Sequence, residues 1–559
     1  MSTTAAREHA GAMDALLVDA ALGRKPFAPS LSTARWAAHL AARPASTTKR
    51  LVGLGGEVAR IAAGRSSLAP SKRDRRFADP AWSQNPFLSR LVQAYLAGSQ
   101  TANDLLAEAN LSKRDADRVG FLIDNVTEAL APSNIPLVNP ASAKAAIDSG
   151  GGSLARGAGQ LVRDLASAPR IPEMVDTSQF EVGTNIAVTP GAVVLRTELF
   201  ELIQYAPQTD TVHDLPLLIV PPTINKFYAI DLAPERSLVE HAVREGRQVF
   251  VISWRNPDAS HADWNFDTYV TGIIEGLDAV EAITGSATTA LGGICSGGVL
   301  ATITAAYLAA TGRMDRIAAL ILAVTVLDSA DAGTAAALAG PRALAAAKAA
   351  SRRKGYLDGA ALAEIFAWLR PGDLVWNYWV NNYLLGKKPP AFDILFWNSD
   401  TTRMTAGLHA DFIDQAAGNL LTHPGSLTVL GEPIDLGAID VDAYVVAGVA
   451  DHITPWQNCY ATTQLLGGTT RFVLSTSGHV AALVNPPGNP KATYRTATDN
   501  PATPQQWLAN AETHEGTWWS DVSAWLKERS GARIPAPATL GGATLPPLDA
   551  APGTYVHAK

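Results

Sequence analysis

The chain has 559 residues, of which 47% are hydrophobic and 17% charged, and its formal net charge is −7 at pH 7. This acidic, weakly charged composition argues against a nucleic-acid-binding protein, which needs a basic patch or stripe. Two cysteines are too few for a disulfide framework, so the composition fits a reducing cytosol. The length predicts two domains, a large α/β unit and an accessory region.

The start of the chain carries no targeting signal that we recognise. Glu8, Asp14 and Asp19 lie where a signal peptide would have a basic start and an apolar run. The longest apolar stretch, residues 317–327, is too short to span a bilayer. We therefore expect no transmembrane segment and only peripheral association with any lipid-like phase.

Residues 1–180 are predicted to form a helical accessory domain. Residues 1–70 are Ala-rich with weak periodicity, which predicts little regular order there. Residues 88–97 and 112–130 read as amphipathic helices. In the second, Leu122, Val126 and Leu130 recur at four-residue spacing and so share one helix face.

Residues 181–559 are predicted to form an α/β catalytic domain, beginning with an antiparallel meander at 185–188, 192–197 and 199–205. Strands and helices then alternate. The expected strands are 215–220, 248–253, 288–292, 317–324, 443–448 and 471–475, and the expected helices are 236–245, 266–283, 297–310 and 456–466. This order predicts a mostly parallel, doubly wound sheet with its site at the carboxyl ends of the strands.

Two segments interrupt or follow this alternation. Residues 328–435 form a helical insertion rich in aromatic residues, including Phe366 and Trp397, at a place where a lid commonly lies. The alternative is an ordinary helical subdomain whose aromatic side chains form its core. Residues from about 530 to 559 are rich in Pro, Ala and Gly, which predicts an extended tail.

The segment Gly293-Ile294-Cys295-Ser296-Gly297 places a cysteine between two glycines, where a predicted strand gives way to a helix. This is the pattern of a nucleophile elbow, with sulfur in place of the usual hydroxyl. The glycines permit a sharp turn and close packing of strand and helix. The backbone N–H of Ser296 is a candidate oxyanion donor. The alternative is a buried structural cysteine in a Gly-rich turn.

A nucleophilic thiol needs a base, and the base needs an orienting acid. In α/β-hydrolases these follow in the order nucleophile, acid, histidine, and Asp451 and His479 each follow one of the last two predicted strands in that order. Asp442 is the rival acid. His452 adjoins the acid and is considered only for a secondary role. The sequence thus predicts an α/β-hydrolase fold with a helical lid insertion and a helical N-terminal domain.

The second oxyanion donor is expected in the loop that follows the strand 215–220. Because Pro221 and Pro222 have no N–H, only the later amides can serve, and Ile224 is the prediction, with Thr223 as the alternative. The other cysteine, Cys459, lies in a predicted helix and is expected to serve packing.

The choice of sulfur indicates the substrate. Moving an acyl group from a thioester to an enzyme thiol changes little in bond energy, so the acyl group stays activated for transfer. We expect His479 to take the proton of Cys295, and the thiolate to attack a thioester carbonyl. A hydroxyl acceptor, deprotonated by the same histidine, then attacks the acyl-enzyme to give an oxygen ester.

From about residue 77 onward, the chain resembles the polyhydroxyalkanoate synthases, most closely the class II, medium-chain-length type. The matching stretches include 77–86, 180–205, 221–228 (PPTINKFY), 253–257 (SWRNP), 293–297, 376–385, 389–404, 451–456, 477–479, 485–490 (NPPGNP) and 551–557 (APGTYVH). The family's catalytic cysteine, aspartate and histidine fall on Cys295, Asp451 and His479. The chain departs from the family pattern in its first 70 residues and in the Ala-rich segment 328–365.

The resemblance implies an acyltransferase that polymerises (R)-3-hydroxyacyl-CoA onto a growing polyester chain, with release of CoA and without a metal or an organic cofactor. It also implies a homodimer in the cytoplasm, at the surface of polyester granules, with granule-associated proteins as further partners. Five residues are candidates for shaping the acyl pocket: Thr325, Ser477, Ala481, His452 and Trp397. The resemblance leaves the preferred acyl length open.

Two other functions fit parts of the same pattern. A cysteine thioesterase or polyester hydrolase would share the fold and the three catalytic residues, and would release free hydroxy acid instead of polymer. A granule-coating structural protein with a vestigial triad would not depend on Cys295.

Overall fold

The structure is a computed structural model that describes residues 20–21, 31–166, 168–329, 341–451 and 453–559. The chain divides into two compact units. One holds the described residues of 31–176 together with 363–391, and the other holds those of 177–362 and 392–559 with residues 20–21. Residues 363–391 of the predicted insertion therefore share a unit with the N-terminal helices.

The first unit is helical. Its longer helices are α3 (Leu31–Ala42), α4 (Pro44–Ala62), α6 (Pro86–Glu108), α7 (Lys113–Ala129), α8 (Pro140–Asp148) and α9 (Gly152–Ala166). The two predicted helices are confirmed as α6 and α7. Each begins at a side-chain cap, since Asn85 accepts from the N–H of Phe87 and Ser112 from that of Asp115.

The expectation of little order before residue 70 is wrong for residues 31–62, which form α3 and α4. Ile61 is the buried residue of α4, so burial of an apolar face contributes little to holding this helix in place. It is held against α6 partly by Arg50, which pairs with Asp104 at 2.8 Å and donates from Nε to Glu108 at 2.7 Å. Residues of 1–30 other than 20–21 lie outside the described part.

The second unit is built on a ten-stranded sheet. In spatial order its strands are β1 (Gly191–Arg196), β2 (Phe200–Tyr205), β5 (Val249–Trp254), β4 (Leu217–Val220), β6 (Thr289–Ile294), β7 (Ile317–Ala323), β12 (Ala443–Gly448), β13 (Thr470–Ser475), β14 (Thr493–Thr496) and β15 (Glu512–Glu515). The six strands from β5 to β13 pair in parallel, and the two at each edge pair antiparallel. The predicted doubly wound sheet is confirmed.

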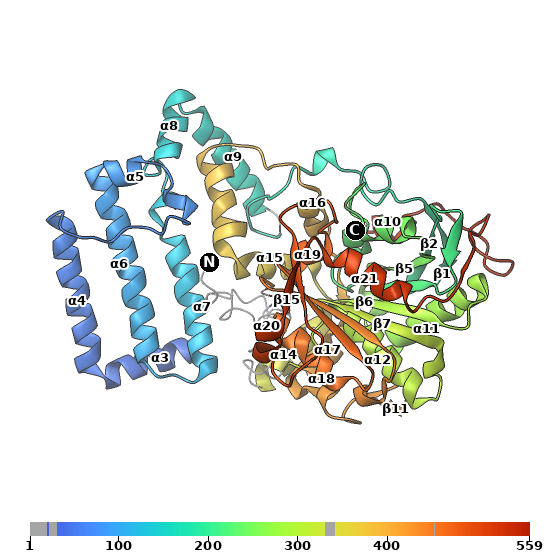
Figure 1. The fold of residues 1–559 in the computed structure, drawn as a ribbon. Coiled ribbons are helices and arrows are strands. Elements are labelled where there is room, and N and C mark those ends of the chain that lie inside the picture. Colours follow the sequence, from blue (N-terminus) through green and yellow to red (C-terminus); the bar gives the residue numbers. More distant parts are fainter. Residues whose placement is uncertain (1–19, 22–30, 167, 330–340, 452) are drawn as a thin grey trace. The chain divides into compact units, whose positions relative to one another are not determined.

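Helices cover both faces of this sheet. Helix α10 (Leu238–Arg244) contacts α21 (Trp518–Lys527), and α11 (Phe266–Thr284) contacts α12 (Ser296–Ala310). These two pairs lie on opposite faces (Figure 1). Strands β4, β5, β6 and β12 are buried along their whole length, as expected for parallel strands covered on both sides.

Sequence patterns failed at the edges of the sheet. Residues 185–188 do not form a strand: Ala187 has φ 55°, and its N–H donates to the Asp231 carbonyl. Strands β14 and β15 were not predicted, because their sequences, TYRT and ETHE, are mostly polar. Polar edge strands lack the apolar alternation on which such predictions depend.

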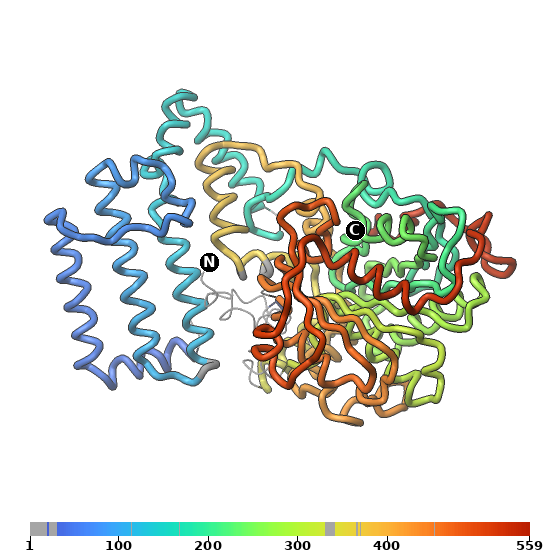
Figure 2. The backbone as a smooth tube through the Cα atoms, viewed as in Figure 1, coloured from blue at the N-terminus to red at the C-terminus, as the bar shows by residue number. Residues whose placement is uncertain are grey.

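The rest of the insertion and the tail complete the second unit. Helices α14 (Pro341–Lys354), α16 (Asp393–Ser399) and α17 (Ala406–Gly418) come from the insertion, while residues 330–340 and the side chain of Phe366 lie outside the described part. In the tail, β16 (Arg533–Pro535) pairs with β3 (Thr211–His213), and Leu548 and Asp549 bond to Val193 of β1. Figure 2 shows the tail, in dark red, running past this edge and turning back.

In the described residues, no helix is both long enough and apolar enough to cross a membrane.

Candidate active site

Cys295 lies in the turn between β6 and α12, at φ 51° and ψ −120°. A side chain rarely adopts this backbone conformation, and surrounding structure must hold it there. The Cys295 N–H donates to the Ala323 carbonyl at the end of β7, at 2.9 Å, and the residue is only 7% exposed. A strained turn from strand to helix with the reactive side chain at its tip is the geometry of a nucleophile elbow.

Three glycines around Cys295 leave no room for a side chain. A Cβ on Gly293 would lie 2.5 Å from the Cα of Gly298. A Cβ on Gly297 would overlap the Pro221 carbonyl oxygen, and one on Gly298 would overlap Thr325 Oγ1. The sequence indicated close packing at Gly293 and Gly297, and the structure adds Gly298. The turn is therefore fixed by close contacts of the glycines with neighbouring backbone and with the side chain of Thr325.

Asp451 follows β12, and His479 begins α19 (His479–Leu483) after β13. The His479 Nδ1 lies 2.7 Å from Asp451 Oδ2. The other carboxylate oxygen accepts from the N–H groups of Ile453 and Thr454, at 2.8 and 2.9 Å, and Thr454 Oγ1 donates to Oδ2 at 2.6 Å. The carboxylate is fully buried and well hydrogen-bonded. Asp442, the rival acid, pairs instead with Arg529.

The side chain of Cys295 lies close enough to the His479 ring to act on its charge. Burial alone would lower the pKa of His479, but the Asp451 carboxylate and the Cys295 sulfur outweigh it and raise the pKa to about 10. Burial would raise the pKa of Asp451, and the contacts with His479 and Thr454 hold it below its usual value instead. The thiol, the imidazole and the carboxylate thus meet from three distant parts of the chain.

The loop after β4 contacts the elbow through Ser296. Its Oγ accepts from the N–H of Thr223 at 3.0 Å and lies 3.2 Å from Thr223 Oγ1. The Thr223 N–H is therefore occupied, whereas that of Ile224 has no hydrogen bond to the described residues. Sequence reasoning considered only the backbone of Ser296. The contact made by its side chain depends on a residue far away in the sequence.

The pocket candidates lie in different surroundings. Thr325 is fully buried and donates to the Ala323 carbonyl at 3.0 Å. Trp397 is buried in the same apolar cluster as Cys295. Ser477 is half-buried, and its carbonyl accepts from the N–H of Ala450. Ala481 is exposed on α19, so its side chain lines no interior wall in this structure.

Two residues near the site have no assigned chemistry. His452 lies outside the described residues. Cys459 is fully buried, with its Sγ 3.7 Å from the Thr454 carbonyl oxygen, and burial raises its pKa well above the usual value. A thiol kept protonated in this way serves packing.

Comparisons with known proteins cover most of the chain. A family model described as the N-terminus of poly-beta-hydroxybutyrate polymerase (PhaC) matches residues 73–242, and one for the alpha/beta hydrolase fold matches residues 216–486. Poly(3-hydroxyalkanoate) polymerase 1 of Ectopseudomonas oleovorans is 46% identical over 530 residues, with 95% of this chain and 94% of the relative covered. Poly(3-hydroxyalkanoate) polymerase subunit PhaC of Cupriavidus necator is 41% identical over 506 residues, with 89% and 85% covered.

Proposed function

Because the chain belongs to the poly(3-hydroxyalkanoate) polymerase family, we propose that it polymerises (R)-3-hydroxyacyl-CoA through an acyl-enzyme on Cys295. Membership makes it an acyltransferase on an α/β-hydrolase scaffold. The observation that supports the mechanism is the placement of Cys295 on a strained elbow, beside a histidine that is hydrogen-bonded to a buried carboxylate.

In the first half-reaction, His479 accepts the proton of Cys295, and the thiolate attacks the thioester carbonyl of the substrate. Asp451 fixes the ring through Nδ1 and stabilises the imidazolium. The developing oxyanion receives hydrogen bonds from the N–H groups of Ser296 and Ile224. The tetrahedral intermediate collapses, the C–S bond to CoA breaks, and the CoA thiolate leaves with the proton from His479.

In the second half-reaction, the hydroxyl group of a 3-hydroxyacyl unit attacks the acyl-enzyme. His479 accepts the hydroxyl proton and returns a proton to the sulfur of Cys295 as the oxygen ester forms. The chain grows by one monomer for each CoA released. These steps need only the three side chains and the two amides, so the proposal includes no metal and no organic cofactor.

The proposal extends to partners and location. The resemblance to class II synthases supports a homodimer at the surface of polyester granules in the cytoplasm, with granule-associated proteins as further partners. Sedimentation of the purified chain with and without substrate tests the dimer. Fluorescence microscopy of a tagged chain in polymer-accumulating cells tests the location.

The decisive experiment measures CoA release and polymer recovery together, for four-carbon and ten-carbon (R)-3-hydroxyacyl-CoA in parallel. Cys295→Ala should lose both, while Cys459→Ala, which removes the other buried thiol, should keep both. Free hydroxy acid without polymer from the unaltered chain would favour a hydrolase. Normal polymer formation by Cys295→Ala would favour a structural protein.

The acyl pocket is a separate part of the proposal. We propose that Thr325, Ser477 and Trp397 shape it, with His452 as a further candidate. Thr325→Leu should shift the monomer ratio of polymer made from mixed substrates, because it enlarges a buried side chain close to the elbow. The same exchange at the exposed Ala481 should have a smaller effect. An unchanged ratio in Thr325→Leu would exclude that residue.

A further inference from the structure

The loop that carries Ile224 also holds a buried lysine that the mechanism does not use. Lys226 is only 3% exposed. A buried ammonium group needs a partner, because its transfer out of water is costly. Its Nζ donates to the carbonyl of Ala558 at 2.6 Å, a residue next to the end of the sequence. The contact therefore joins the loop to the last residues of the tail.

The acceptor has a second donor and charged neighbours. Asn256 Nδ2 reaches the same Ala558 oxygen at 3.4 Å. Burial lowers the pKa of Lys226 to about 8, the Asp400 carboxylate opposes this shift, and Lys559 and Arg403 add to it. The surroundings of Lys226 therefore contain one acidic group and two further cations.

The tail that presents Ala558 is itself anchored. Glu201 in β2 is fully buried, and its carboxylate accepts from the N–H groups of Thr554 and Tyr555, at 2.9 Å each, and from Thr554 Oγ1 at 2.7 Å. Arg255 donates to the Tyr555 hydroxyl at 2.6 Å. Because the preceding residues are fixed to the sheet, the position of the Ala558 carbonyl is set by the scaffold.

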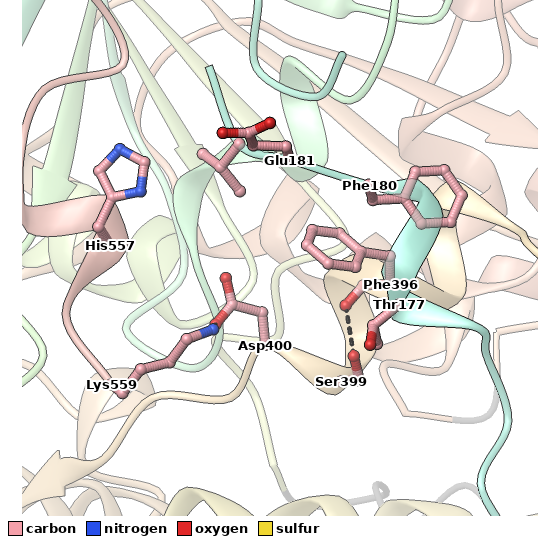
Figure 3. A pocket seen from close by; sticks show the side chains of 9 residues that line it. Thr177, Phe180, Glu181, Phe396, Ser399, Asp400, His557 and Lys559 are labelled. Atoms are coloured by element: carbon pink, nitrogen blue, oxygen red, sulfur yellow. Dashed lines mark hydrogen bonds and ion pairs between the residues drawn. The ribbon is translucent and has the colours of Figure 1, made fainter. Parts of the chain in front are cut away.

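The same loop is held from its other side by the insertion. Trp397 Nε1 donates to the Lys226 carbonyl at 2.7 Å, and the Tyr228 hydroxyl donates to Asp400 Oδ2 at 2.8 Å. Lys559 pairs with the other oxygen of Asp400 at 3.2 Å. Figure 3 shows Lys559 extending from the tail toward Asp400, beside a cavity of about 470 Å³ that is also lined by His557 and Phe396.

We propose that Lys226 is a positioning residue that ties the loop carrying the Ile224 N–H to the Ala558 carbonyl. Through this bond, the C-terminal tail orients the second oxyanion donor, the N–H of Ile224. The inference rests on the proposed function. Lys226 follows Ile224 closely in the chain, so a displaced lysine would move the donor, and small misplacements of catalytic groups cost much rate.

The first test is Lys226→Met, which keeps the length of the side chain and removes its donor. We expect kcat for CoA release from (R)-3-hydroxydecanoyl-CoA to fall about 10- to 100-fold. The displaced Ile224 N–H would no longer stabilise the oxyanion, and this hydrogen bond forms in the transition state. The KM should stay within about threefold. The matched control is Lys559→Met, which alters an 83% exposed lysine side chain of the same tail and should keep kcat within about twofold.

The second test removes the acceptor without altering the loop. A chain that ends at His557 should show the same fall in kcat as Lys226→Met. The combination of both changes should cost no more than either alone, because both break the bond between Lys226 and Ala558, and Lys559→Met accounts for the pair with Asp400 that the shortened chain also loses. Additive losses, or an unchanged kcat in Lys226→Met or in the shortened chain, would overturn the inference.

Failure of this inference and failure of the proposed function give different results. If Cys295→Ala is inactive while Lys226→Met keeps full kcat, the inference fails and the proposed function stands. If Cys295→Ala keeps polymerase activity, the proposed function itself fails. Thermal unfolding of Lys226→Met and of the shortened chain guards against misfolding, since a fall in kcat accompanied by loss of cooperative unfolding would contradict a positioning role.

Discussion

The elbow and the loops that face it are held in place by different forces. Around Cys295 the turn is fixed by glycine backbones that touch neighbouring backbone and Thr325. The loop 221–228 and the turns bearing Asp451 and His479 are fixed by side-chain hydrogen bonds, such as those of Ser296, Thr454 and Trp397. Cys295 is thus positioned by close packing, and the segments that face it are positioned by polar contacts of side chains.

This difference predicts how each region fails. A side chain added at the elbow would overlap neighbouring atoms, so it should lower stability and activity together. Removing a hydrogen bond from a facing loop should lower activity more than stability. The loop keeps its packing, but its catalytic groups are no longer correctly oriented. Substitutions of both kinds can separate these two modes of failure.

Asp451→Asn should have the largest effect on rate. The amide keeps the size of the side chain but removes the charge that holds the His479 ring and stabilises its protonated form. We expect kcat to fall by about 10³- to 10⁴-fold, as in other triads that lose their acid. Single-turnover CoA release measures it. A loss below about tenfold would contradict the assigned role of Asp451.

The same variant has a pH signature. The raised pKa of His479 adds stability that is full below its ordinary value of 6.5 and is lost as the pH rises toward about 10. The lowered pKa of Asp451 adds stability that is present above 3.8 and is lost as the pH falls through its folded value. The difference in melting temperature between the unaltered chain and Asp451→Asn should therefore be largest between about pH 4.5 and 6.5, and shrink toward pH 10. A difference that grows with pH would contradict this assignment.

Gly297→Ala tests the packed region. Its new methyl group would overlap the carbonyl oxygens of Pro221 and Val220, which cannot move without disturbing β4. We expect the free energy of unfolding to fall by about 3 kcal/mol, with activity lost in parallel. Denaturant unfolding measures the first quantity. Full stability with lost activity would show that the elbow is less tightly packed than the structure indicates.

Ser296→Ala tests the contact between the two regions. It removes the acceptor of the Thr223 N–H, which lies in a residue only 6% exposed. An unsatisfied buried donor costs about 1 to 3 kcal/mol, and the loop should shift to find a new partner. We expect the loss in kcat, expressed as a free energy, to exceed the loss in the free energy of unfolding. Ser296→Thr keeps the hydroxyl and should recover part of the rate. Equal kcat in Ser296→Ala and the unaltered chain would show that the bond between Thr223 and Ser296 does not orient the loop.

Gly292→Ala should have the smallest effect and the opposite sign. Its methyl group would enter an apolar cavity of about 50 Å³ lined by Leu217, Ile219 and Trp518, with its nearest contacts at 3.6 Å. Replacing a strand glycine and filling this space should add about 0.5 to 1 kcal/mol of stability. Gly293→Ala, one residue along, should destabilise instead. If both substitutions destabilise equally, close packing is not specific to the elbow.

The sequence alone pointed to the residues that we propose carry the chemistry. Alternating strands and helices with buried apolar runs defined the parallel sheet, and the glycine-flanked Cys295 marked the elbow, because both patterns lie within short stretches of the sequence. The order of Asp451 and His479 after their strands followed from the same alternation. These features are local, so they can be read from a chain without coordinates.

Only the tertiary structure decided how those residues are supported. The bond between Ser296 and Thr223, that between His479 and Asp451, and the contact of Lys226 with Ala558 join residues whose spacing in the chain carries no signal. The edge strands β14 and β15 also formed without an apolar pattern, through strand pairing. A polar contact between distant segments depends on where the whole chain has folded, and no local pattern records it.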